Sequence, residues 1–214
     1  AQTNNMWHGL REGFHYIRQN PLLPGLIFFS FLIEFTAFPI VNGLMAVVGD
    51  ELYNLDGTGI GLLAAVASTG ALSGALLLGI KRRVVNPSRV MIIGSLAWHA
   101  LMLVLAMEPQ LWLFAIILLL WGFSGGTTFV AMIVALLRAA PSKTRGRVMG
   151  IRSLGIYGLS LGLLFGGWIS EEAGPATMFG VLGTFGLTAT VIASIIWPAL
   201  FRGHNELQSQ ENSS

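Results

Sequence analysis

Six apolar stretches, each close to the length of a membrane-spanning helix, divide this chain. About 20 apolar helical residues cross the roughly 30 Å of hydrocarbon in a bilayer. Only 10% of the 214 residues are charged, whereas soluble domains have about a quarter. The sequence therefore predicts an all-α integral membrane protein with six transmembrane helices. The stretches cover residues 22–48, 59–80, 90–107, 111–137, 148–170 and 175–200.

The charges between these stretches alternate in sign along the chain. Acidic residues occupy the connections after the first, third and fifth stretches, and basic residues occupy the other connections and both flanks. The positive-inside rule then places the basic side, with both termini, in the cytoplasm of a multi-pass protein of the cell (inner) membrane. A net charge of +2 arranged in this way suits anionic headgroups and predicts no nucleic-acid partner. The basic residues are Arg11, Arg18, Lys81, Arg82, Arg83, Arg89, Arg138, Lys143, Arg145, Arg147, Arg152 and Arg202.

The chain divides into three regions on this basis. Residues 1–21 form a cytoplasmic linker with an amphipathic surface helix, which Pro21 terminates. Residues 22–200 form the transmembrane bundle, and residues 201–214 form a polar, disordered cytoplasmic tail. The chain has no cysteine, no phosphate-binding loop and no His/Asp/Glu spacing typical of a metal site. We therefore expect no cofactor and no metal.

Glu34 is the one acidic residue in the middle of a predicted span. Phe38 and Asn42 follow it on the same helix face, and Pro39 predicts a kink beside it. Glu34 is either a proton-carrying or cation-binding carboxylate that faces a wet cavity, or a neutral group at a helix contact. The first role requires that Glu34 border a central cavity. His99, in the third span, is predicted to be a packed neutral imidazole.

Glycines recur at four-residue steps in two of the predicted spans. Gly70 and Gly74 lie in the second span, and Gly158, Gly162 and Gly166 lie in the fifth. This spacing puts the glycines on one helix face, where their lack of a side chain lets two backbones approach. We predict that both sets serve helix packing.

The fourth span contains Gly122-Phe-Ser-Gly125. A G-x-S-G motif in the fourth of six spans resembles the rhomboid intramembrane serine proteases, which need a histidine on the sixth span to activate the serine. The sixth span here, residues 175–200, contains no histidine. The sequence therefore predicts no catalytic residues and no enzyme, and Ser124, Thr127 and Thr128 either hydrogen-bond within the helix or line a cavity.

Three segments carry a more specific resemblance. The segment Leu10–Leu23 resembles the linker before the seventh span of major facilitator superfamily transporters, in the branch of the enterobactin exporter and macrolide-efflux-like proteins. Gly59–Gly79 resembles the eighth span, and Arg145–Gly150 the loop between spans ten and eleven. The loop Gly79–Arg89 keeps the glycine and basic character of the family motif but lacks its aspartate. The resemblance implies the C-terminal six-span half of that fold, a three-plus-three inverted repeat.

The resemblance also implies a function. The chain would be half of a secondary active transporter that expels amphipathic or hydrophobic small molecules by proton-coupled alternating access. Its partners would be the lipid bilayer, the small-molecule substrate, and either a missing N-terminal half or a second copy of the chain. We favour a fragment of a longer protein. A non-transporting membrane scaffold is the alternative from another class.

The candidate site residues fall into two groups. Glu34 leads the residues proposed to contact the substrate or couple the proton; the others are Asn42, Thr127, Thr128 and Tyr157. Basic residues of two cytoplasmic loops are proposed to hold the loops together or to bind headgroups. These residues are Lys81, Arg82, Arg83, Arg145 and Arg147.

Overall fold

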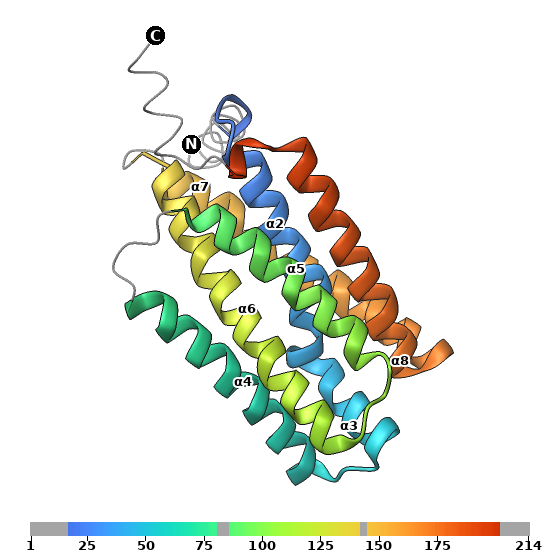
Figure 1. The fold of residues 1–214 in the computed structure, drawn as a ribbon. Helices are drawn as coiled ribbons and strands as arrows, with labels where there is room; N and C mark the ends of the chain where they lie inside the picture. The colour runs from blue at the N-terminus through green and yellow to red at the C-terminus, as the bar shows by residue number, and fades with distance from the viewer. Residues whose placement is uncertain (1–16, 81–85, 142–144, 202–214) are drawn as a thin grey trace, which may run out of the picture.

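The computed structural model describes residues 17–80, 86–141 and 145–201, and in these ranges it is a bundle of long helices (Figure 1). The predicted all-helical membrane fold is confirmed at this level. Predictions that concern Lys81, Arg82, Arg83, most of the linker helix and almost all of the tail lie outside the described residues. The elements are α2 (Leu23–Thr36), the π-helix η1 (Ile40–Leu44), α3 (Met45–Tyr53), α4 (Gly57–Ile80), α5 (Pro87–Leu105), α6 (Leu111–Ala139), α7 (Arg145–Ser153) and α8 (Ile156–Ile196).

Five helical segments of the described chain are long and apolar enough to cross a membrane. The fifth, Arg145–Ile196, has 52 residues, far more than the ~20 that one crossing needs. The structure breaks this segment at Gly174, whose φ of 84° and ψ of 161° are not helical. The other four segments are Leu23–Tyr53, Gly57–Ile80, Pro87–Leu105 and Leu111–Ala139.

The break at Gly174 turns α8 back on itself. A φ of 84° is a conformation that glycine adopts readily, and Pro175 starts the following helical arm with a fixed φ. Side chains of Met178 and Leu182 on the second arm lie against Gly166 on the first. The two arms of α8 therefore run side by side in opposite directions.

The first apolar segment is also interrupted, at the position that its proline predicts. α2 ends at Thr36, and the π-helical turn η1 begins directly after Pro39. Proline lacks the backbone N–H that would continue the ladder, and a π-turn accommodates the disruption. The helical ladder is thus interrupted near Pro39, but Pro39 itself keeps helical angles and the kink is at Gly43 (φ 178°, ψ −43°), farther from Glu34 than predicted.

The start of α5 is fixed by its capping residue. The side chain of Asn86 accepts a hydrogen bond from the backbone N–H of Arg89, and Pro87 occupies the first helical turn. The Asn86 amide also donates to the carbonyl oxygen of Phe201 at 2.8 Å, and the Arg89 side chain donates to the same oxygen. These bonds join the start of α5 to the end of the described chain.

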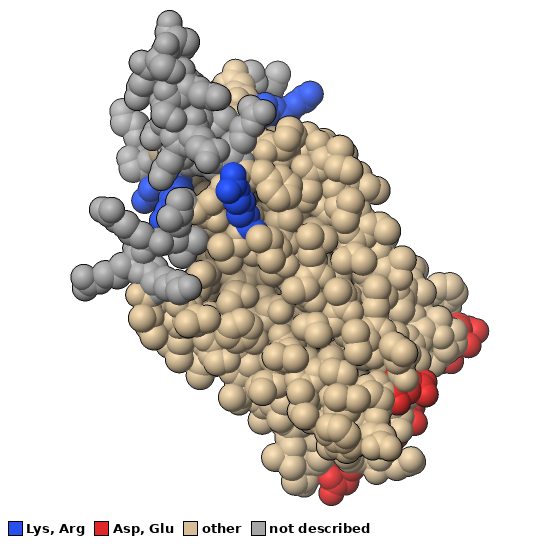
Figure 2. All heavy atoms as spheres, in the orientation of Figure 1, with Lys and Arg blue, Asp and Glu red and all other residues tan. Residues whose placement is uncertain are grey.

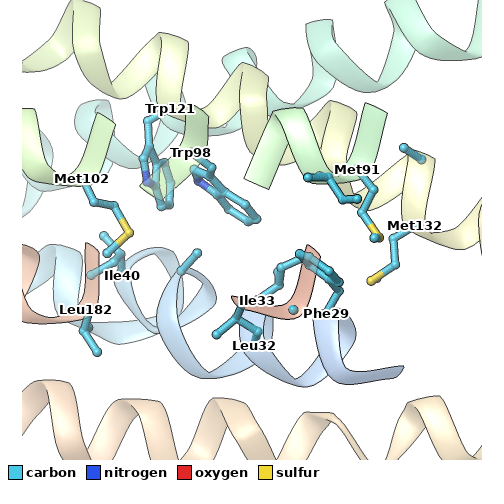
Figure 3. Close-up of a cluster of buried hydrophobic side chains, with 14 of the residues drawn as sticks. Phe29, Leu32, Ile33, Ile40, Met91, Trp98, Met102, Trp121, Met132 and Leu182 are labelled. Atoms are coloured by element: carbon cyan, nitrogen blue, oxygen red, sulfur yellow. The ribbon is translucent and has the colours of Figure 1, made fainter. Parts of the chain in front are cut away.

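The core lies where α6 packs on α4 and α5, and where α8 packs on α2 and α5. Large apolar side chains from three helices are buried there and face one another (Figure 3): Phe29 and Ile33 of α2, Met91 and Trp98 of α5, and Trp121 of α6. Many large apolar side chains on the outer faces are exposed. This distribution is expected for helices that meet lipid rather than water.

The described charges separate along the length of the bundle. Figure 2 shows basic side chains gathered at one end of this face, and aspartate and glutamate side chains gathered at the other. The surface between the two ends is a broad band without charged side chains on this face. This arrangement fits a bundle that crosses a bilayer along its long axis.

Candidate functional site

A cavity of about 480 Å³ opens between α2 with η1, α4, α5 and α6. The kink after α2 and the close approach of α4 to α6 shape its walls. Most of the lining is apolar, with Asn42 and Ser68 as polar exceptions, which suits a ligand with a large apolar surface. The lining residues are Phe38, Val41, Asn42, Ala67, Ser68, Ala71, Leu72, Ala75, Trp98, Trp121, Gly122, Gly125, Gly126, Phe129 and Val130.

Four aromatic rings form a continuous wall of this cavity. The ring centroids of Phe38 lie 5.9 Å from Trp98 and 5.7 Å from Phe129, both edge to face, and Trp98 lies 5.3 Å from Trp121. Such contacts fix ring positions beyond what burial alone provides. The indole N–H groups of both tryptophans are buried and donate no hydrogen bond within the part of the chain that the structure describes.

Asn42 projects from the π-turn on the cavity side. Its Nδ2 donates a hydrogen bond to the carbonyl oxygen of Phe38 at 2.9 Å, within the interrupted part of the first segment. The π-turn is a form that recurs at functional sites because it displaces side chains from regular helical register. The kink therefore gives an apolar cavity one polar side chain on its wall.

Glu34 forms an ion pair with Arg152. The Nη2 atom of Arg152 lies 3.6 Å from Oε1 of Glu34, and the two side chains are only 17% and 14% exposed. The guanidinium also lies over the ring of Phe129, 5.3 Å from its centroid. Nε of Arg152 is buried and has no hydrogen-bond acceptor among the described residues. The pair is therefore desolvated but incompletely hydrogen-bonded.

Glu34 lies close to the cavity but does not line it. Glu34 is not among the residues that line the 480 Å³ space, but it lies one helical turn before Phe38, which does line it. Phe129 lines the cavity on one side and contacts Arg152 on the other. One aromatic ring thus separates the ion pair from the cavity.

Sequence reasoning missed Arg152 and Phe129. Arg152 stands in a run of basic residues, which topology explains, and a signal lay in its apolar neighbours Ile151 and Leu154. An arginine among the apolar residues of one span needs an acidic partner, and Glu34 is the acidic residue in the middle of the first apolar span. For Phe129 the sequence carries no signal, because apolar α6 has several aromatic residues.

Three other predicted site residues lie away from the cavity lining. The Thr127 hydroxyl donates to the Phe123 and Ser124 carbonyls, and its methyl group lies against Gly74. Thr128 is fully buried and donates to the Ser124 carbonyl. Tyr157 is 65% exposed on the outer surface of α8. Their proposed roles in coupling or substrate contact remain predictions.

The described residues of the basic loop lie at the end of α6 and the start of α7. Arg145 donates a hydrogen bond from Nη2 to the Leu137 carbonyl at 3.1 Å, which joins α7 to the last turn of α6. Arg147 is exposed on α7. Asn20, before α2, donates to the Ala139 carbonyl at 3.2 Å and connects a third segment to this end.

His99 is completely buried, as a packed imidazole should be. Its Nε2 lies 2.8 Å from the Thr36 hydroxyl, and its Nδ1 lies 2.8 Å from the Ser95 carbonyl. The Ser95 hydroxyl in turn lies 3.0 Å from that of Thr190 on α8. The ring therefore joins α2, α5 and α8, and both of its nitrogens are engaged away from Ser124.

Comparison with known proteins fits this arrangement of apolar helices around a cavity. The profile of the Major Facilitator Superfamily matches residues 25–212. The chain belongs to the Major Facilitator Superfamily. A curated relative in this comparison is the multidrug efflux pump Tap of Mycolicibacterium fortuitum, which is 25% identical over 196 residues. The match covers 86% of this chain but 47% of Tap, so the chain spans about half the length of that relative.

Membership in the superfamily fixes the broad class of the molecule. It is a multi-pass membrane protein of a transporter family.

Proposed function

We propose that this chain is one six-span half of a secondary active transporter that expels amphipathic or hydrophobic small molecules. Its place in the superfamily, the efflux pump among its relatives and the apolar cavity support the proposal. The two arms of α8 are the fifth and sixth spans, since each is long enough to cross a bilayer. An N-terminal half, or a second copy of the chain, completes the transport path.

The glycine contacts support a three-plus-three inverted repeat. Gly70 and Gly74 of α4 lie against the backbones of Leu119 and Phe123 in α6. Gly158 and Gly162 of α8 lie against the backbones of Phe31 and Phe35 in α2. The glycine pairs are shifted by 88 residues (158 − 70 and 162 − 74), and their partners by the same 88 (119 − 31 and 123 − 35). Each interface therefore repeats the other with the roles of the two halves exchanged, as internal two-fold symmetry requires.

The same shift relates the two walls of the cavity. Phe38 and Asn42 on one wall correspond to Gly126 and Val130 on the other (126 − 38 and 130 − 42 are both 88). In the proposed repeat the cavity thus lies between equivalent positions of the first helix of each half, and residues of α4 and α5 complete its lining. Transporters with inverted repeats place their substrate sites at the repeat interface. This placement is the observation that carries the proposed function.

Within this scheme the basic end of the bundle is cytoplasmic, and Glu34 couples transport to protons. The positive-inside rule supports the orientation, because the described basic and acidic side chains gather at opposite ends (Figure 2). Glu34 does not line the cavity, although the expected coupling role requires this, so the role proposed here acts through Arg152 and Phe129; the burial of Glu34 and its pairing with Arg152 support it. A carboxylate that loses and regains its proton there changes the charge beside the substrate.

The test is efflux from proteoliposomes that contain the complete protein, with ethidium as an aromatic cationic probe and an imposed pH gradient. Glu34→Gln, which removes the titratable group with little change of shape, should abolish the dependence of efflux on the gradient. Glu108→Gln, at the exposed acidic end, is the matched control and should retain it. Unchanged proton-linked efflux in Glu34→Gln would exclude the coupling role, and absence of any efflux in the unmodified protein would favour a scaffold.

A further inference from the structure

The Phe129 side chain has two roles in the packing: it contacts Arg152, and it forms part of the cavity wall. One face of its ring lies beneath the Arg152 guanidinium at 5.3 Å, and its ring meets Phe38 edge to face at 5.7 Å. The same side chain lines the cavity. Phe129 therefore connects the Glu34–Arg152 pair to the wall of the cavity. The position of this ring therefore depends on both neighbours.

The charge on Glu34 holds Arg152 in its place. A buried cation that loses its counter-ion is strongly disfavoured, because its desolvation is no longer offset by attraction. Nε of Arg152 already has no acceptor among the described residues, so no hydrogen bond from that atom retains the side chain there. α7 ends at Ser153, one residue later, and α8 begins at Ile156. When Glu34 is neutral, Arg152 moves toward water at the basic end of the bundle.

The helices of the bundle contribute other ionisable groups besides this pair. α5 contributes His99, whose ring is held by Thr36 and Ser95. The remaining groups are Asp50, Glu51 and Tyr53 on α3, Arg138 in the last turn of α6, Arg89 at the start of α5, Arg145 and Arg147 at the start of α7, and Tyr157, Glu171 and Glu172 on α8. Among the described residues, Arg152 is the charged group that forms an ion pair with Glu34.

We propose that Phe129 couples the charge of Glu34 to the shape of the cavity. When Arg152 leaves, the Phe129 ring moves into the space that the guanidinium vacated, because an empty space beside it is unfavourable. The cavity then widens on the α6 side. A ligand that packs against Phe129 while the ring lies beneath Arg152 stabilises the ionised form of Glu34. Ligand binding and protonation of Glu34 therefore weaken each other through the position of this ring. The role of this coupling in transport rests on the proposed function, whereas the dependence of cavity shape on the charge of Glu34 does not.

The absence of cysteine makes the coupling measurable without a ligand. Ser68→Cys places one thiol on the exposed wall of the cavity, and its rate of alkylation by N-ethylmaleimide at fixed pH reports access. Adding Glu34→Gln should raise this rate by about threefold or more, because the wider state becomes the major one. In a Phe129→Leu background, Glu34→Gln should no longer change the rate.

Matched variants separate coupling from general loosening. Val41→Ala alters a wall residue outside the Phe38–Phe129–Arg152 contacts, and it should preserve the response to Glu34→Gln. Arg152→Gln removes the other member of the pair and should widen the cavity as Glu34→Gln does. Thr177→Cys, in a separate groove on α8, should show no response.

Two results would overturn the proposal. One is an alkylation rate at position 68 that Glu34→Gln and Arg152→Gln both leave unchanged. The other is a response that survives Phe129→Leu at full size, which would show that the ring carries no coupling. Neither result bears on efflux, so the proposed function would stand or fall separately on the ethidium experiment.

Discussion

Gly162 lies directly against the carbonyl oxygen of Phe35, so that a β-carbon on this residue would overlap the backbone of α2. Gly74 and Phe123 stand in the same relationship between α4 and α6. Because lipid tails are as apolar as the helix surfaces, packing of this kind is a main source of helix association in a membrane. The two glycine contacts therefore set the spacing of four helices.

Gly162→Ala should lower the stability of the protein. The added methyl group forces α2 and α8 apart, at a cost of about 1–3 kcal/mol. The measurement is the midpoint of thermal unfolding of detergent-solubilised protein. Gly61→Ala in α4 is the control, because nothing lies within 4 Å of its new β-carbon; it should be neutral or slightly stabilising. Equal midpoints for the two variants would contradict backbone contact at Gly162.

Breaking the Glu34–Arg152 pair should cost more than removing both charges. Glu34→Gln removes the counter-ion of a largely buried guanidinium, which must then stay unpaired or give up its packing to reach water, and Arg152→Gln leaves a largely buried carboxylate without its counter-ion. A double-mutant cycle measured by thermal or denaturant unfolding should therefore give a coupling of about 1–3 kcal/mol. Strict additivity of the two single changes would show that the pair contributes no mutual stabilisation.

Loss of the His99 ring should weaken the junction of three helices. His99→Leu fills most of the same volume but leaves the buried Thr36 hydroxyl and Ser95 carbonyl without the imidazole, at about 1–3 kcal/mol. The unfolding midpoint should fall. Thr188→Ala provides the comparison, since that exposed hydroxyl donates within its own helix. A midpoint unchanged in His99→Leu would show that the network is dispensable.

The hydroxyl of Tyr53 should contribute a smaller amount. It donates a 2.7 Å hydrogen bond to the Pro109 carbonyl, which joins the end of α3 to the segment before α6. Tyr53→Phe keeps the ring contact with Phe114 at 5.1 Å and removes only the bond, so a loss of about 0.5–1.5 kcal/mol is expected. Tyr157→Phe alters an exposed phenol and should leave the denaturation midpoint in place. A larger effect from Tyr157→Phe would reverse this ranking.

Much of the fold could be predicted because the bilayer restricts it. Apolar length identifies the helices, Pro39 marks the interruption after α2, and glycine spacing marks the faces that approach closely. The predicted start of the third span, at 90, lies three residues after Pro87, because the Asn86 cap and the following proline extend α5 beyond its apolar run. The spacing Gly70-x-x-x-Gly74 recurs as Gly158-x-x-x-Gly162, which is the sequence pattern that the proposed repeat would produce.

The site was less predictable because it depends on which helices meet. Glu34 could be singled out by its charge, but its pairing with Arg152 joins α2 to α7, which are far apart in the chain. The contact of Phe129 with that pair depends on the rotation of α6, which hydropathy does not specify when a helix is apolar all round. The sequence placed Thr127 and Thr128 on α6 but left open whether their hydroxyls bond within the helix or line a cavity; in the structure both hydroxyls donate to carbonyls of their own helix.

The separation of charge along the bundle makes the molecule electrically polar from end to end (Figure 2). Turning it over in the bilayer would drag its arginines through hydrocarbon, at about 2.5–3.5 kcal/mol for each one even on the mildest scale. Its orientation is therefore permanent once it has been inserted. Conformational changes of the bundle must then be internal rearrangements during which its basic and acidic ends stay on their own sides of the membrane. A membrane potential therefore always acts on the charges of the bundle in the same direction.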